Sequence, residues 1–210
     1  MRILLAVVAL AACSPSPSKQ LDLDRIRVSL DAKMRTDTVG QGKFAAPATF
    51  VLVDADNTAT EGAYVTLGGT LTDASGATVS TLAPQSLWVP AGETRTYALI
   101  DAERRERPAA KAAVITVKGA MVPTSPPPAH VEDVHEFTDN GHVVVQGMLV
   151  NDAPKRGQLI VIGAFHDAGK HPLTRPFDVV PVEPHERKTV QFVGGPGSVT
   201  GAIFVGDVQY

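Results

Sequence analysis

Short alternating segments separated by turn residues recur along most of this chain, and they constrain its fold more than any other feature. In residues 64–72 every second position, from Val65 to Leu71, is apolar or glycine, and threonine or glycine fills the positions between. A period of two places the apolar residues on one face of a β-strand. Residues 73–76 (Asp-Ala-Ser-Gly) follow, and glycine readily adopts the positive φ of a tight turn. The pattern therefore predicts an antiparallel strand that ends in a turn.

Similar segments occupy much of the remaining chain. Val, Ile, Leu and Thr are plentiful, aromatic residues make up 5% of the chain, and 18 Gly and 16 Pro separate the segments. This composition favours strands over helices. Residues 37–47 are expected to form a loop, and residues 102–111 a solvated connection, because Pro108 limits a helix there. We expect strands at 26–30, 48–54, 64–72, 78–82, 86–89, 94–100, 112–118, 131–137, 142–150, 158–167, 172–182, 187–193 and 199–210.

The pattern occurs twice, at a constant offset of 94 residues. Residues 65–73 align with residues 159–167, and Pro90 aligns with Pro184. Between the two copies, residues 123–128 (PTSPPP) can neither pair in a sheet nor continue a helix. Strands repeated in this way predict an all-β protein of two antiparallel β-sandwiches in series. The expected domains are residues 21–120 and 130–210, joined by a Pro-rich linker at 121–129.

A family resemblance rests on one short motif in each copy. Residues 69–74 read Gly-Thr-Leu-Thr-Asp-Ala, residues 163–168 read Gly-Ala-Phe-His-Asp-Ala, and in each copy a turn, a Pro turn and another strand follow. This arrangement resembles the FxLyD-type immunoglobulin-like domains of bacterial surface lipoproteins, although the leading Phe and the Tyr of that name are absent from both copies. The resemblance implies tandem immunoglobulin-like β-sandwiches without catalytic activity.

The N-terminal residues have the pattern of a secretory signal. A single positive charge at Arg2 precedes an apolar run, residues 3–12, which is too short to cross a bilayer core of about 30 Å. The run ends in Leu10-Ala11-Ala12, directly before Cys13, the only cysteine of the chain. These four residues resemble the lipobox of bacterial lipoproteins. A plain signal peptide with an incidental cysteine, or a buried N-terminal helix, is the alternative.

The lipobox resemblance implies cleavage of a signal peptide (1–12) and a lipidated tether (13–20). Cys13 would carry diacylglycerol on its sulfur and a fatty acid such as palmitate on its nitrogen. One acyl chain binds a membrane only marginally, whereas two or more anchor stably. Ser14, a non-acidic residue, favours the outer membrane in the sorting rule that the family suggests. We therefore expect a location in the bacterial cell envelope, facing the periplasm or the cell surface.

Few residues point to chemistry. The chain contains none of the usual serine-hydrolase, zinc-protease or phosphate-loop motifs, and the only cysteine is assigned to the anchor. Nineteen basic residues against 22 acidic ones leave no basic surface for nucleic acid. We expect no catalytic residue, no enzyme activity and no cofactor. A hydrolase with an unrecognised site is the alternative.

Histidine is distributed unevenly, because all six histidines follow residue 128. That part of the chain has six Lys and Arg against ten Asp and Glu, so protonation of the histidines near pH 6 would neutralise its charge. Imidazoles also bind zinc and copper. His166 and His171 flank one turn and are the best candidates for a metal site, whereas His130 and His135, five residues apart on a strand, are expected on opposite faces.

The sequence thus predicts a lipid-anchored envelope lipoprotein that binds or scaffolds another protein. Antiparallel sheets have edge strands that accept a partner strand through backbone hydrogen bonds, and such binding requires no distinctive residue. A zinc- or copper-binding lipoprotein that uses the His-bearing domain is the first alternative.

Overall fold

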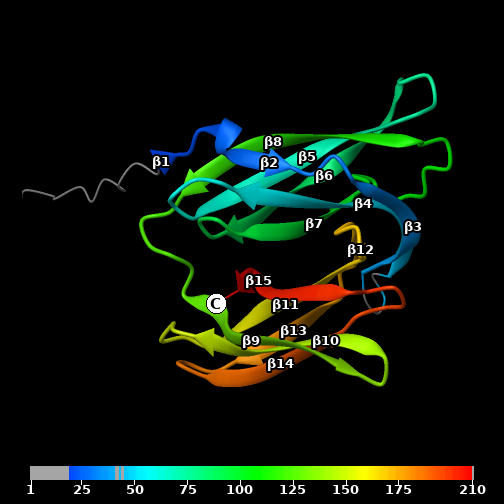
Figure 1. Ribbon diagram of the computed structural model, residues 1–210. Helices are drawn as coiled ribbons and strands as arrows, with labels where there is room; N and C mark the ends of the chain where they lie inside the picture. Colours follow the sequence, from blue (N-terminus) through cyan, green and yellow to red (C-terminus); the bar gives the residue numbers. More distant parts are fainter. Residues whose placement is uncertain (1–18, 41–42, 44, 210) are drawn as a thin grey trace, which may run out of the picture.

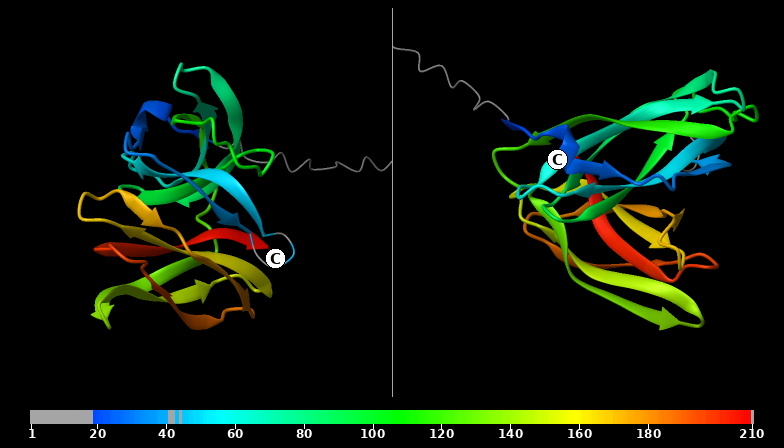
Figure 2. Two further views of the ribbon diagram at one scale, coloured as in Figure 1. Left: turned by 90° about the vertical axis from the view of Figure 1, so that its right-hand side faces the viewer. Right: turned by 45° about the horizontal axis from the view of Figure 1, so that its top comes forward.

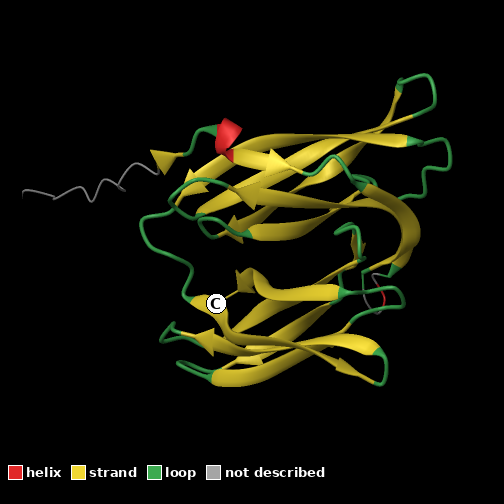
Figure 3. Ribbon diagram, viewed as in Figure 1, coloured by secondary structure: helices red, strands yellow, loops and turns green. Residues whose placement is uncertain are grey.

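A computed structural model of the chain describes residues 19–40, 43 and 45–209. The expected signal peptide, lipobox and Cys13 lie outside these residues. Within them the protein is all-β, as the sequence predicts, and its only named helix is a single turn of 3-10 helix, η1 (Figure 3). No helix in the described part of the chain is both long enough and apolar enough to span a bilayer. The elements are β1 (Lys19–Gln20), η1 (Leu23–Arg25), β2 (Ile26–Val28), β3 (Lys33–Val39), β4 (Ala46–Asn57), β5 (Ala63–Thr72), β6 (Thr78–Val89), β7 (Thr94–Ile100), β8 (Ala112–Val122), β9 (Ala129–Asp139), β10 (His142–Asn151), β11 (Gly157–His166), β12 (Pro172–Thr174), β13 (Phe177–Val182), β14 (Arg187–Val193) and β15 (Thr200–Gln209).

The strands form four antiparallel sheets. In the first half of the protein, residues 19–122, one sheet has the order β1-β8-β5-β6, and in the other β4 lies between β7 and the pair β2 and β3. In the second half, residues 129–209, one sheet has the order β14-β10-β9, and in the other β11 lies between β15 and the pair β12 and β13. Figure 1 shows the sheets as successive layers, with the β4 and β11 sheets in the middle. The two views in Figure 2 agree.

The second half repeats the strand order of the first. In both halves one sheet is centred on a long strand, β4 or β10, and the next strand, β5 or β11, is central in the other sheet. The turn after each central strand is also repeated. The Asp73 carboxylate accepts hydrogen bonds from the N–H groups of Ser75 and Ala77, and the Asp167 carboxylate accepts them from those of Gly169 and His171. The 94-residue repeat in the sequence is therefore a repeat in the structure.

Two apolar clusters hold the layers together, and one of them extends across both halves. The first contains Val65, Leu67 and Tyr97 of the first half, together with Ile162 and Phe204 of the second. The second cluster lies between the two sheets of the second half and includes, among others, Val145, Leu149, Leu159, Phe165 and Phe192. The two halves therefore share a buried apolar interface.

Three local expectations are wrong. Residues 37–47 are not all loop, because β3 pairs with β4 along its whole length, from Lys33 opposite Leu52 to Val39 opposite Ala46. Residues 33–39 lack alternating apolar residues, so their own sequence does not indicate a strand. Pairing with β4 stabilises them as one. Residues 78–89 form one strand, β6, where two were expected, and its pairing with β5 contains register shifts. The expected strand at 172–182 is divided into β12 and β13.

Candidate binding cleft between the two halves

Next to the shared apolar cluster, three side chains of the second half contact the first half: His166, Arg175 and Phe204. His166 Nε2 is 2.9 Å from Asp54 Oδ2, and both side chains are largely buried. Arg175 Nε donates a hydrogen bond of 2.6 Å to the carbonyl oxygen of Thr96. The Arg95 guanidinium of the first half lies over the Phe204 ring of the second, 4.9 Å from its centroid. These contacts bring β4 and β7 of the first half against the β11 sheet.

The two histidines named as the best candidates for a metal site make separate contacts. His166 contacts Asp54, whereas His171 Nδ1 lies 3.0 Å from Asp167 Oδ1, and its Nε2 lies 3.9 Å from Asp31 Oδ2. Among the residues that the structure describes, no group of three or more His, Cys, Asp or Glu side chains is placed to hold a metal ion. His166 therefore contacts the first half, whereas His171 contacts Asp167 of its own half and lies near Asp31 of the first half.

The expected placement of His130 and His135 on opposite faces of their strand is wrong. The β9–β10 register shifts between Gln146 and Met148, so that two residues of β9, one of them Asp133 with a φ of 50°, face Gly147 alone. Such a bulge reverses the alternation of side chains beyond it. His130 and His135 consequently share one face of β9.

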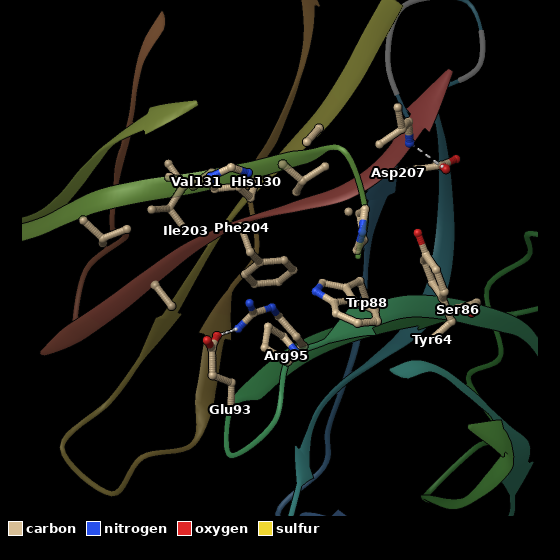
Figure 4. A pocket seen from close by; sticks show the side chains of 18 of the residues that line it. Tyr64, Ser86, Trp88, Glu93, Arg95, His130, Val131, Ile203, Phe204 and Asp207 are labelled. Carbon is tan, nitrogen blue, oxygen red and sulfur yellow. Dashed lines mark hydrogen bonds and ion pairs between the residues drawn. The ribbon is translucent and has the colours of Figure 1, made fainter. Parts of the chain in front are cut away.

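A cleft of about 680 Å³ lies where the two halves meet, and we call it the inter-half cleft. The first half contributes residues of β5, β6 and β7, and the second contributes the start of β9 and almost all of β15 (Figure 4). Its lining residues are Tyr64, Ser86, Trp88, Pro90, Glu93, Arg95, Pro127, Ala129, His130, Val131, Val134 and 201–208.

Two aromatic rings form a corner on the first-half wall of this cleft. The rings of Tyr64 and Trp88, on the paired strands β5 and β6, have centroids 5.5 Å apart and planes inclined at 59°. Gly62 allows this position of Trp88, since a Cβ at residue 62 would lie 2.4 Å from the indole ring. The Tyr64 side chain remains 38% exposed. Partial burial, and then the negative charge of Asp207, raise the pKa of its hydroxyl.

The cleft also contains both paired and unpaired polar groups. Arg95 forms an ion pair of 2.7 Å with Glu93 and lies over Phe204, and its buried Nε has no hydrogen-bond partner among the described residues. Asp207 accepts a hydrogen bond from the N–H of Val208, but it forms no ion pair with any described residue. Figure 4 shows Arg95 and Phe204 below the β15 ribbon, with Asp207 at its far end.

Most of these lining residues escaped the sequence analysis. Trp88 is the only tryptophan, and Tyr64 is the first residue of the clearest alternating segment, so both are recognisable as large side chains on expected strands. Their proximity to β15 depends on packing between segments more than 100 residues apart. The Asp73 and Asp167 turns, in contrast, lie where the repeated motif placed them.

Neither a family model nor a curated protein matches this chain. The fold and the inter-half cleft are therefore the basis for the functional argument that follows.

Proposed function

We propose that this protein is a lipid-anchored lipoprotein of the bacterial cell envelope, built from two tandem immunoglobulin-like β-sandwiches, that binds another protein in the inter-half cleft. The observation that carries the proposal is the cleft itself, where Tyr64 and Trp88 leave aromatic surface partly uncovered beside the apolar cluster that the two halves share. Aromatic side chains are enriched in protein-binding sites because they bury much apolar area and lose little side-chain entropy.

The position of the N-terminal strand supports an anchored arrangement. Strand β1 pairs with the end of β8, where Gln20 lies opposite Met121, and Met121 in turn lies opposite Tyr64 of the cleft. The tether that leads from Cys13 therefore joins the folded protein at the same end as the cleft. With Cys13 lipidated, a partner in the cleft is held close to the membrane surface.

Site-specific photo-crosslinking in intact bacteria tests the binding proposal. A photoreactive amino acid at Ser86, an exposed position in the cleft, should form an adduct with a particular protein, and Tyr64→Ala should reduce that adduct several-fold. The same amino acid at Lys155, an exposed loop residue outside the cleft, is the control. The absence of any adduct specific to Ser86 would contradict the proposal.

The anchor has an independent test. Cys13→Ser should abolish incorporation of a fatty-acid analogue and leave the leader uncleaved, whereas Ser14→Ala should preserve both. Persistent labelling of the Cys13→Ser variant would exclude lipidation at this residue.

A further inference from the structure

We propose that the inter-half cleft binds an extended peptide segment that adds to the free edge of β15 and carries an apolar residue next to a basic one. This inference rests on the proposed function and specifies the chemistry of its partner. Three features carry it: a strand edge without a partner strand, the length of that edge in the cleft, and the aromatic and charged side chains of the cleft walls.

The first feature is the backbone of β15. This strand pairs only with β11, so its other edge has no partner strand among the described residues. The N–H of Gly163 donates to Pro176 on the opposite side of β11, and Gly163 lies opposite Ile203. In antiparallel pairing the alternate residues direct their N–H and C=O groups to opposite edges. Ile203, and with it Val205, therefore presents its backbone groups to the free edge.

Glu136 marks this edge independently. Its carboxylate accepts a hydrogen bond of 2.7 Å from the N–H of Gly201, which has the same orientation as Ile203 and Val205. Because Glu136 belongs to β9, this hydrogen bond shows that a group outside the β11 sheet can reach an outward N–H of β15. Beyond Gly201 the edge lines the cleft as far as Val208. A strand edge without a partner strand can bind an extended chain through main-chain hydrogen bonds.

The second feature is the length of β15 that the cleft reaches. The cleft is lined by β15 without interruption from Gly201 to Val208. These eight residues are as long as an ordinary β-strand, so an extended segment of several residues can lie along them.

The third feature is the chemistry of the walls. The planes of the Tyr64 and Trp88 rings are inclined at 59°, so together they offer apolar surface on two sides of one apolar side chain. Arg95 is already paired with Glu93, which leaves Asp207 as the lining charge without an ion-pair partner among the described residues. A Lys or Arg of the peptide complements Asp207. Asp207 lies close enough to Tyr64 for its charge to raise the pKa of the Tyr64 hydroxyl. A peptide that occupies both places therefore has its apolar and its basic residue close together in sequence.

Selection of peptides from a random dodecapeptide library displayed on phage, with the full chain as the target, tests this inference. We expect enrichment of peptides that place Lys or Arg next to an apolar residue. A parallel selection on Asp207→Lys should enrich peptides with Asp or Glu at that position. Circular dichroism and thermal unfolding verify that the variant is folded.

Backbone methylation of the best peptide then tests the pairing with β15. N-methylation of the alternate amides that face β15 should weaken binding at least tenfold, and methylation of the intervening amides should change it less than threefold. Trp88→Ala should also weaken binding at least fivefold. Equal effects of the two methylation patterns, or peptides with no charge reversal on Asp207→Lys, would overturn the inference.

The outcomes separate this inference from the proposed function. If no peptide is enriched while the Ser86 crosslink still captures a protein, the partner binds through a folded surface, and only the peptide inference fails. If a chito-oligosaccharide binds the cleft with an affinity that depends on Trp88 and the peptides do not, the site binds sugar and the inference also fails. If the Ser86 crosslink captures no protein and the selection enriches no peptide, both the proposed function and the peptide inference fail.

Discussion

Each half contains a buried asparagine whose side chain forms several hydrogen bonds to the backbone. The Asn57 side-chain amide donates hydrogen bonds to the carbonyl oxygens of Glu61 and Val89, and that of Asn151 donates to those of Lys155 and Glu183. Each also accepts a hydrogen bond from the N–H group two residues later. Asn57 and Asn151 are 94 residues apart, so the bonds recur at the repeat offset. They join the loop after β4 or β10 to the end of a strand in the other sheet.

We predict that Asn151→Ala lowers the free energy of unfolding by about 2–4 kcal/mol, because buried carbonyl and N–H groups lose their hydrogen bonds. Urea titration followed by circular dichroism measures this loss. Gln158→Ala, at an exposed position of the adjacent strand, is the control and should change stability by less than about 0.5 kcal/mol. Equal effects of the two substitutions would refute the structural role of Asn151.

A second residue makes stability depend on pH. The fully buried Asp101 carboxylate accepts hydrogen bonds from Arg107, at 2.9 and 3.1 Å, and from the Ser80 hydroxyl. Burial by itself raises the pKa of Asp101, but the hydrogen bonds from Arg107 and Ser80 outweigh it and hold the pKa below its ordinary value. The ionised form is therefore favoured in the folded state.

A pKa lowered by folding adds stability above the pKa of the unfolded chain, about 3.9, which is lost as the pH falls through the folded-state pKa. We predict that the wild type is more stable than Asp101→Asn at pH 7 and that the difference shrinks progressively below about pH 4. Asp101→Ala should cost about 3 kcal/mol at pH 7, because Arg107 loses its buried partner. Urea titrations between pH 2 and pH 7 provide the measurement, and a difference independent of pH would contradict the assignment.

At the scale of elements, β5 and β11 are equivalent strands with different outer faces. Thr66, Gly68 and Thr70 of β5 correspond to Ile160, Ile162 and Ala164 of β11. The outer face of β11 is apolar because it packs against the first half, and Ile162 and Ala164 are buried in the shared cluster. A strand covered on both faces needs an unbroken apolar run, and a strand covered on one face needs alternation.

We predict that Ile162→Ala destabilises the protein by about 2–4 kcal/mol, because it opens a cavity between the halves. The matched substitution Thr70→Ala, on the uncovered outer face of β5, should remain within about 0.5 kcal/mol of wild type. Chemical unfolding of both variants tests the difference. A small effect at Ile162 would show that the interface contributes little.

The sequence predicts elements well where the pattern is local. Residues 94–100 and 187–193 form strands with the expected bounds, because alternation and flanking turns specify them without reference to distant partners. Strand β3 was missed because its partner β4 supplies its stability. The run Leu159–Phe165 contained a further signal, since its continuous apolar character already indicates a strand covered on both faces.

For the whole molecule, the shared cluster makes the two halves one structural unit. The inter-half cleft exists only because both halves hold fixed positions, so its aromatic corner and its β15 wall come from distant parts of the sequence. Periodicity describes each strand separately and contains no information about which outer faces meet. The site could therefore not be predicted from the sequence, although the repeat and the all-β class could.

We predict a single cooperative unfolding transition. Fluorescence of Trp88 reports on the first half, whereas far-ultraviolet circular dichroism reports on strands of both, and the two curves should coincide in urea. Ile162→Ala, which weakens the shared cluster, should separate them. A wild-type circular dichroism curve with two steps would show that the halves unfold independently.

The unequal outer faces of β5 and β11 also limit how many copies of this unit can be stacked. A third copy ahead of the first half would need an apolar outer face on β5, where Thr66 and Thr70 lie instead. A copy beyond the second half would have to cover Glu132 of β9, which pairs with Arg187 of β14 across the outer face of their sheet. Head-to-tail contacts that do not close generate filaments. Thr66 and Thr70 on one terminal face, and the Glu132–Arg187 ion pair on the other, therefore disfavour a further unit stacked in the same way.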